Sequence, residues 1–311
     1  MVQQGRQRRF PFGAEFFPTS ADGPGSDFRV PASARAVTLR VHDPDGGPPR
    51  DLTMSSDGDG TFRVFVPGVR PGARYGFLLD GEGPFPDPAS RWLPLGPHGP
   101  SEVIASTPPP PLGAGRPEAP VLYELHIGTF TPAGTYAAAA AALPALRDLG
   151  VTTLELLPVC AFPGRFGWGY DGVAPMAPFP GYGSPDDLRA FVAAAHALGL
   201  AVILDVVYNH LGPDGNYLPR FLPKLFTERH HTAWGAALNF DGEGSAPVRQ
   251  LLCQSAALWI AEYGLDGLRF DAVQDIKDDT PDEHMVLALC RAARAAAPGR
   301  PLYLVAENER Q

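Results

Sequence analysis

Cysteine is scarce in this sequence. Only Cys160, Cys253 and Cys290 occur among 311 residues, and no CxxC pair is present. Three isolated thiols exclude a disulfide scaffold and give no zinc or redox signature. Such a sparse, odd set is typical of a reducing compartment, so we expect the protein to be cytoplasmic.

Long apolar runs and positive charge are also missing. No run approaches the ~18 apolar residues that cross a bilayer. The N-terminal MVQQGRQRRF carries charge without the apolar core of a secretory signal. The formal net charge of −9 disfavours nucleic acid and anionic membranes as partners and suits a neutral ligand.

Proline and glycine, by contrast, are abundant, with 36 and 35 residues that follow no period. In residues 1–105 they punctuate short alternating strands, expected at 36–44, 60–69 and 73–81. This pattern predicts an all-β, immunoglobulin-like sandwich. Four consecutive prolines in 106–120 then favour a stiff, extended linker.

From residue 121 to 311 the pattern changes to alternating strands and helices, which predicts a parallel sheet. One helix has a clear start, because Ser184, Pro185 and Asp187 form a capping signature. No phosphate-binding glycine motif follows the first strand, so we favour an α/β fold with the first five strands of a (β/α)8 TIM barrel. The expected strands are 121–130, 151–159, 201–210, 267–273 and 302–308, and the expected helices are 135–150, 184–200, 247–264 and 281–299.

Polar side chains follow the ends of three of these strands. The carboxyl ends of parallel strands form the edge where barrels carry their active sites. Two carboxylates about 5–5.5 Å apart suit retaining glycoside hydrolysis. Arg269 points to the same face as Asp271 and would keep it ionised, although a structural ion pair is the alternative for these two residues. The polar residues are Asn209, His210, Asp271 and Glu307.

Three segments resemble conserved regions of the α-amylase superfamily of retaining glycoside hydrolases. They are DVVYNH (205–210), GLRFDAV (267–273) and LVAEN (304–308). Within this superfamily, YELHIGTFTPAGTY (123–136) and FGWGYDGVAPMAP (166–178) are similar to the malto-oligosyltrehalose trehalohydrolase family. That resemblance implies hydrolysis of the α-1,4 bond next to the terminal trehalose of malto-oligosyl trehalose, which releases trehalose. It also implies functional pairing with a malto-oligosyltrehalose synthase.

The resemblance implies a role for each candidate residue. Asp271 would be the nucleophile and Glu307 the general acid/base. The residues that would bind substrate or support the site are Tyr170, which stacks on the sugar, His210, which hydrogen-bonds it, Arg269, which contacts the nucleophile, and Asp205 and Asn209. His126 is either a core histidine or a support of the site.

No cofactor is expected. Some amylases bind calcium through the asparagine equivalent to Asn209, but we see no further ligand cluster and expect no required metal. We interpret the pair His230 and His231 as part of a loop.

The sequence departs from the family pattern near its end. The family has a third carboxylate in an NHD-like motif after the fifth strand, and the sequence ends at Gln311 before such a motif. A complete barrel also needs roughly 250 residues. We therefore expect a chain truncated after its fifth barrel strand. The alternatives are a glycogen branching or debranching enzyme, which shares these modules, and a non-catalytic glucan-binding fragment.

Overall fold

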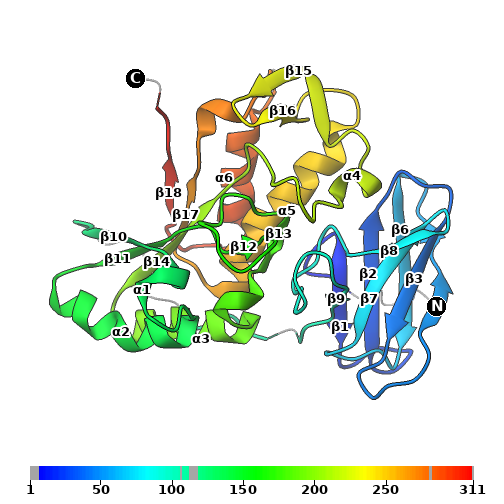
Figure 1. The fold of residues 1–311 in the computed structure, drawn as a ribbon, viewed down its shortest axis with the longest axis horizontal. Helices are drawn as coiled ribbons and strands as arrows, with labels where there is room; N and C mark the ends of the chain where they lie inside the picture. The colour runs from blue at the N-terminus through cyan, green and yellow to red at the C-terminus, as the bar shows by residue number, and fades with distance from the viewer. Residues whose placement is uncertain (1–6, 106, 112–117, 280–281, 310–311) are drawn as a thin grey trace.

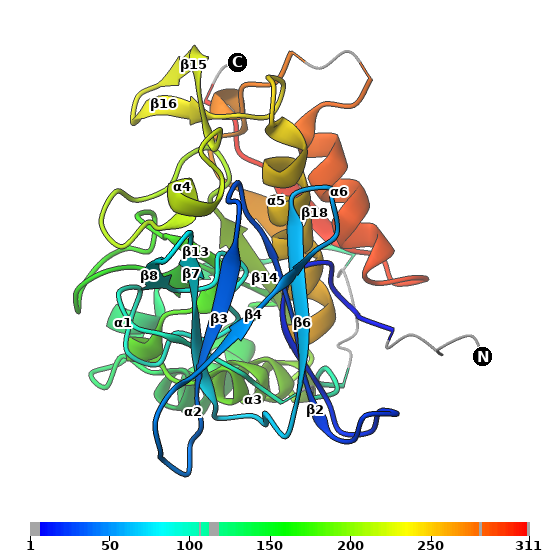
Figure 2. The same cartoon turned by 90° about the vertical axis from the view of Figure 1, so that its right-hand side faces the viewer.

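The computed structural model describes residues 7–105, 107–111, 118–279 and 282–309. An all-β part lies beside an α/β part, and the chain passes from one to the other once (Figures 1 and 2). Within the described residues, no helix has both the length and the apolar character needed to cross a membrane.

The all-β part consists of two antiparallel sheets. One has the strand order β1-β2-β6-β5, and the other has the order β4-β3-β7-β8 with β9 beside β7. Alternation explains the position of β3, where Val37, Leu39 and Val41 are fully buried and the residues between them are more exposed. The strands are β1 (Gly13–Phe17), β2 (Gly25–Pro31), β3 (Val37–His42), β4 (Arg50–Thr53), β5 (Ser55–Ser56), β6 (Thr61–Pro67), β7 (Arg74–Leu79), β8 (Glu82–Phe85) and β9 (Ser101–Glu102).

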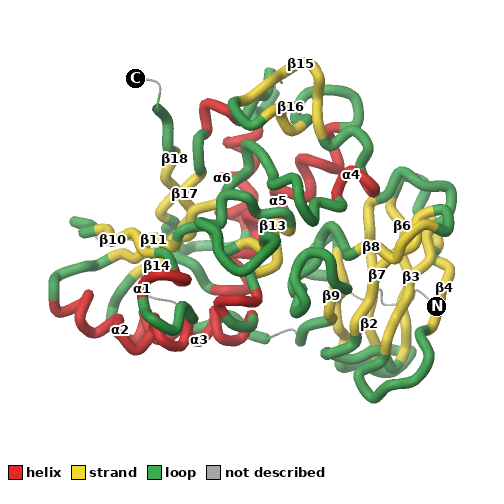
Figure 3. Tube along the Cα trace, viewed as in Figure 1, coloured by secondary structure: helices red, strands yellow, loops and turns green. Residues whose placement is uncertain are grey.

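The α/β part is built on a five-stranded parallel sheet whose strand order follows the chain order (Figure 3). Its strands are β10 (Leu122–Leu125), β11 (Thr153–Leu156), β14 (Ala201–Val206), β17 (Gly267–Phe270) and β18 (Tyr303–Ala306). All six residues of β14 are buried, as a strand covered on both faces requires.

Helices pack in pairs against this sheet, with α2 beside α3 and α5 beside α6. The helices are α1 (Ile127–Phe130), α2 (Tyr136–Asp148), α3 (Pro185–Ala197), α4 (Leu218–Phe221), α5 (Ser245–Tyr263) and α6 (Met285–Ala295), with the 3₁₀ turns η1 (Pro180–Tyr182) and η2 (Val273–Asp275). Two antiparallel pairs complete the part, β12 (Cys160–Ala161) with β13 (Ala174–Pro178), and β15 (Phe226–Thr232) with β16 (Gly235–Leu238).

The capping signature of α3 is confirmed. The hydroxyl of Ser184 accepts a hydrogen bond from the backbone N–H of Asp187, and the Asp187 carboxylate accepts one from the Ser184 N–H. Pro185 occupies the first helical turn, where its missing N–H costs nothing.

Two expectations about residues near the site were wrong in part. The strand expected at 121–130 ends at Leu125, because the His126 carbonyl accepts hydrogen bonds from the N–H groups of Thr129 and Phe130 and begins α1. The histidines at 230 and 231 lie in β15 rather than in a loop. This strand pairs with β16 in a hairpin, in which His231 faces Ala236.

Side chains of α5 connect the two parts of the molecule. The Gln254 amide accepts a hydrogen bond from the Phe12 N–H at 2.8 Å and donates one to the Phe12 carbonyl at 3.0 Å. Residues 106 and 112–117 of the expected linker lie outside the described residues, so the division at 106–120 stays a prediction.

Candidate active site

Arg269 lies at the centre of the candidate site. Its Nη1 donates hydrogen bonds to Asp205 Oδ2 at 2.7 Å and to Asp271 Oδ1 at 3.0 Å. Its Nη2 lies 3.2 Å from Glu307 Oε2. Asp205 belongs to β14, whereas Asp271 follows β17 and Glu307 follows β18. One guanidinium therefore gathers carboxylates from three neighbouring strands at their carboxyl ends.

The turn after β17 orients Asp271. Asn209 Nδ2 donates to Asp271 Oδ2 at 2.8 Å and to the Asp271 carbonyl at 2.9 Å, and only 9% of Asp271 is exposed. The next residue, Ala272, has φ +41°, in the left-handed region that alanine rarely adopts. Its N–H donates to Glu307 Oε2 at 2.8 Å. This strained turn links the two candidate catalytic carboxylates through the backbone.

Asp205 is buried between Arg269 and Tyr170. The Tyr170 hydroxyl donates to Asp205 Oδ2 at 2.8 Å. Burial raises the pKa of Asp205 to about 7, although the charge and hydrogen bond of Arg269 act to lower it. Burial and the Asp205 charge raise the pKa of Tyr170. For Arg269, burial acts to lower the pKa, but the neighbouring carboxylates outweigh it and the pKa is raised.

His210 adjoins this network through Asn209, whose side-chain oxygen contacts His210 Nδ1. Burial lowers the pKa of His210, although the Asp271 charge acts to raise it, so the neutral imidazole is favoured at neutral pH. The indole of Trp234 stacks on the imidazole, with centroids 4.6 Å apart and planes inclined by 7°. Trp234 lies at the tip of the β15–β16 hairpin.

A cavity of about 550 Å³ lies among the loops that follow β10 and β11. Its lining includes His126, Phe166, Trp168 and Tyr182. His126 Nε2 lies 2.8 Å from the Tyr182 hydroxyl and 3.0 Å from the Gly167 carbonyl. The imidazole is thus held by polar contacts at the cavity wall, while Trp168 is 63% exposed beside it.

The structure brings together all seven side chains that the sequence singled out, in one chain of contacts. Sequence reasoning missed Glu155, which lies on β11 with Oε1 3.8 Å from Arg269 Nε. Burial raises the pKa of Glu155. Its signal was available in the sequence, because Glu155 is the only charged residue of the strand TLEL. The stacking of Trp234 on His210 had no local signal, because it depends on how the hairpin folds back. The seven residues are Tyr170, Asp205, Asn209, His210, Arg269, Asp271 and Glu307.

Within the described part of the chain, the side chains spaced closely enough to hold a metal ion lie outside this site. They are His230, Asp241 and Asp279.

Comparisons with known proteins agree with this geometry. The alpha amylase catalytic domain family matches residues 129–237. The malto-oligosyltrehalose trehalohydrolase of Deinococcus radiodurans is 43% identical over 294 residues, which are 93% of this chain and 46% of that protein. The enzyme of the same name from Rhizobium sp. is 48% identical over 244 residues, 76% of this chain and 40% of that protein.

A solved structure is also similar. The crystal structure of a Salmonella typhimurium protein assigned to the alpha amylases superposes with a TM-score of 0.84 at 40% identity, over 97% of this chain and 50% of that one. The chain spans about half the length of the curated relatives it matches.

These similarities show an α-amylase-type fold of mixed sheets and helices, and they confirm the resemblance seen in the motifs. The branching or debranching alternative is not better supported. The chain belongs to the malto-oligosyltrehalose trehalohydrolase family of the α-amylase superfamily.

Proposed function

We propose that this chain is a retaining glycoside hydrolase acting on malto-oligosyl trehalose. It would cleave the α-1,4 bond next to the terminal trehalose and release free trehalose. One observation carries the proposal, namely that the Arg269 guanidinium contacts both Asp271 and Glu307 at the ends of neighbouring strands. The trehalohydrolase names of relatives at 43–48% identity support the choice of substrate.

The reaction divides into two displacements. Glu307 donates its proton to the leaving glycosidic oxygen while an Asp271 carboxylate oxygen attacks the anomeric carbon, forming a glycosyl ester. Glu307, now a carboxylate, takes a proton from water, and the water oxygen cleaves the ester. Two inversions at the same carbon retain the configuration.

The surroundings of the two carboxylates support these roles. Asp271 is buried and accepts hydrogen bonds from Arg269 and Asn209, which hold its carboxylate in place for attack. The Glu307 side chain is 36% exposed, so a leaving group and then water can reach it. Solvent thus reaches Glu307 more easily than Asp271, as the proton transfers of the acid/base require.

Neighbouring side chains would hold the sugar at the cleavage point. Tyr170, fixed by Asp205, offers an aromatic ring for stacking, and His210 offers a ring nitrogen for a sugar hydroxyl. We propose that the glucan chain continues into the cavity beside Trp168, whose exposed indole suits a pyranose face.

The proposed architecture is the first five strands of a (β/α)8 barrel behind an immunoglobulin-like sandwich. The strand order β10-β11-β14-β17-β18 supports the barrel, because a doubly wound sheet would reverse its order at the first strand. We propose that residues 1–105 form the sandwich, 106–120 the linker and 121–311 the barrel part.

The substrate would come from a malto-oligosyltrehalose synthase in the cytoplasm, a location that the sparse cysteines favour.

Trehalose release tests the proposal directly. The chain is incubated with malto-oligosyl trehalose and, separately, with the uncapped maltooligosaccharide of equal length. We expect free trehalose from the capped substrate only, and a new reducing end in the α configuration by NMR.

Asp271→Asn and Glu307→Gln should each lower kcat by about 10³-fold or more, because each removes a group that acts in the transition state.

Two variants control for the loss of a carboxylate as such. Asp148→Asn changes an exposed acid at the end of α2, and Glu309→Gln changes an exposed acid two residues after Glu307; both should keep the wild-type rate. The proposal is wrong if the chain releases no trehalose from the capped substrate, or if either site variant retains full activity. New α-1,6 branches would support the branching alternative instead.

A further inference from the structure

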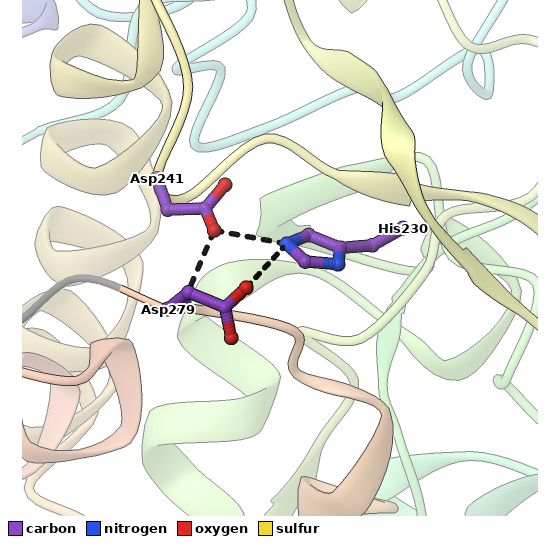
Figure 4. A group of neighbouring side chains, drawn as sticks. All are labelled: His230, Asp241 and Asp279. Carbon is purple, nitrogen blue, oxygen red and sulfur yellow. Dashed lines mark hydrogen bonds and ion pairs between the residues drawn. The ribbon is translucent and has the colours of Figure 1, made fainter.

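A group of three potential metal ligands lies outside the candidate active site (Figure 4). His230 comes from β15, Asp241 from the segment between β16 and α5, and Asp279 from the segment between η2 and α6. Figure 4 shows the imidazole and both carboxylates turned toward a common point. His230 Nε2 lies 2.9 Å from Asp241 Oδ2 and 3.6 Å from Asp279 Oδ2.

These separations match the edges of a metal coordination polyhedron. Zinc binds histidine nitrogen and carboxylate oxygen at about 2.0–2.2 Å, so two ligands of a tetrahedral ion lie roughly 3.3 Å apart. The two measured separations lie on either side of that value, and all three ligand atoms lie within 4.8 Å of one another. The exposed Asp279 side chain is the one that would move to bring all three ligand atoms around an ion.

The three side chains differ in exposure to solvent, with Asp241 on the buried side of the group and Asp279 on the exposed side. The Asp241 side chain is only 2% exposed, and its Oδ2 is fixed by the backbone N–H of Asp279 at 3.0 Å. Its second oxygen, Oδ1, is buried and accepts no hydrogen bond from the described residues; its contact there is the ion pair with Arg229. The Asp279 side chain is 69% exposed, which leaves an entry path and room for a water ligand.

One cation already lies near the carboxylates. Arg229 Nη1 is 3.2 Å from Asp241 Oδ1, and Arg229 Nη2 is 3.7 Å from Asp279 Oδ2. The Arg229 side chain is 55% exposed and can turn into solvent when a dication neutralises the same carboxylates. Arg229 thus supplies a counter-charge that a bound dication would replace.

We propose that His230, Asp241 and Asp279 form a binding site for a divalent transition-metal ion, with water completing its coordination. A neutral imidazole with carboxylates suits zinc and its neighbours, whereas calcium and magnesium prefer oxygen ligands alone. The ion would tie the β15–β16 hairpin, which carries Trp234, to the segment that leads into α6. The site is independent of the proposed hydrolase reaction, and it departs from the expectation of no metal.

Calorimetric titration of the metal-stripped chain with ZnCl₂ tests the site, with thermal unfolding measured in parallel. We expect a site with one equivalent of Zn²⁺, a micromolar Kd and a raised Tm, and no Tm shift with MgCl₂ or CaCl₂ at the same concentration. His230→Ala and Asp279→Asn should each weaken this binding by about tenfold or more.

His231→Ala is the matched control, because His231 is the next residue of the same strand and is exposed. This variant should bind Zn²⁺ like the wild type. Asp279 is exposed, so its variant should fold normally, and equal melting in EDTA checks this. The proposal is wrong if the wild type shows no Zn²⁺ binding, if His230→Ala and Asp279→Asn bind as the wild type does, or if His231→Ala loses binding equally.

Discussion

Four carboxylates share the guanidinium of Arg269. Asp205 and Asp271 accept its hydrogen bonds, Glu307 lies 3.2 Å away, and Glu155 lies 3.8 Å away. If all four carboxyl groups were ionised, the single charge of Arg269 could not balance them. The pKa of Asp205 is raised to about 7 by its burial above all, and the charge of Asp271 adds to this effect. Asp271 is thus paired with Arg269, while burial favours the neutral form of Asp205 more than in water.

This arrangement makes stability depend on pH with a definite sign. The pKa of Asp205 rises from 3.8 to about 7 on folding, so the folded state binds more protons than the unfolded state between these values. The stability due to this side chain is therefore complete below about pH 4 and is lost as the pH rises to about 7. Asp205→Asn removes this component. In urea unfolding from pH 4.5 to 7.5, the wild type should lose free energy of unfolding relative to this variant.

The exposed Asp51, which pairs with Arg40, provides the control. The Arg40 hydrogen bond lowers the pKa of Asp51. The Asp51→Asn variant should therefore still lose stability between pH 4.5 and 7.5, as the wild type does. Parallel curves for the wild type and Asp205→Asn would contradict the assignment of a raised pKa to Asp205.

Among the elements, the strands of the parallel sheet are shorter than their apolar patterns predicted. The strand expected at 267–273 ends at Phe270, because Ala272 adopts a left-handed conformation and donates its N–H to Glu307. The turn places Asp271 at the sheet edge, beside the carboxylates of the neighbouring strands. The end of the element is therefore set by the contacts of the site rather than by local β propensity.

The start of α3, by contrast, follows local chemistry. Ser184 satisfies the N–H of Asp187, which would otherwise lack a partner in the first turn. Ser184→Ala should therefore lower the free energy of unfolding by about 1 kcal/mol, measured by urea denaturation. Ser33→Ala, at an exposed serine between β2 and β3, should leave the stability nearly unchanged. Equal effects of the two changes would show that the cap does not stabilise the helix.

At the scale of the whole molecule, a buried ion cluster holds the all-β part against the α/β part. Glu262 of α5 is fully buried; its Oε1 accepts from Arg189 of α3 at 2.7 Å, and its Oε2 lies 3.3 Å from Arg91. Arg91 belongs to the segment between β8 and β9. Both arginine side chains are themselves buried, so the cluster is stable only while charges of opposite sign balance.

Removal of the central carboxylate should therefore be costly. Glu262→Gln leaves the buried Arg91 without its carboxylate partner, whereas Arg189 keeps its ion pair with Asp186 at 2.6 Å. The free energy of unfolding should fall by about 3 kcal/mol in urea denaturation. Glu283→Gln is the control, because Glu283 also accepts hydrogen bonds from an arginine, Arg291, but this pair is exposed to solvent. It should change the stability little. A similarly small effect for Glu262→Gln would mean that the cluster does not secure the contact between the two parts.

The sequence by itself determined the alternation of strands and helices, the α3 cap and the polar strand ends that carry Asp271 and Glu307. These features depend on neighbours two to four residues apart, where periodicity and capping act. Only the tertiary structure decided that Arg269 contacts four carboxylates, that Trp234 stacks on His210, and that His230, Asp241 and Asp279 lie close together. Such contacts form when the strands align and the hairpin folds back, and side-chain spacing along the chain does not encode that approach.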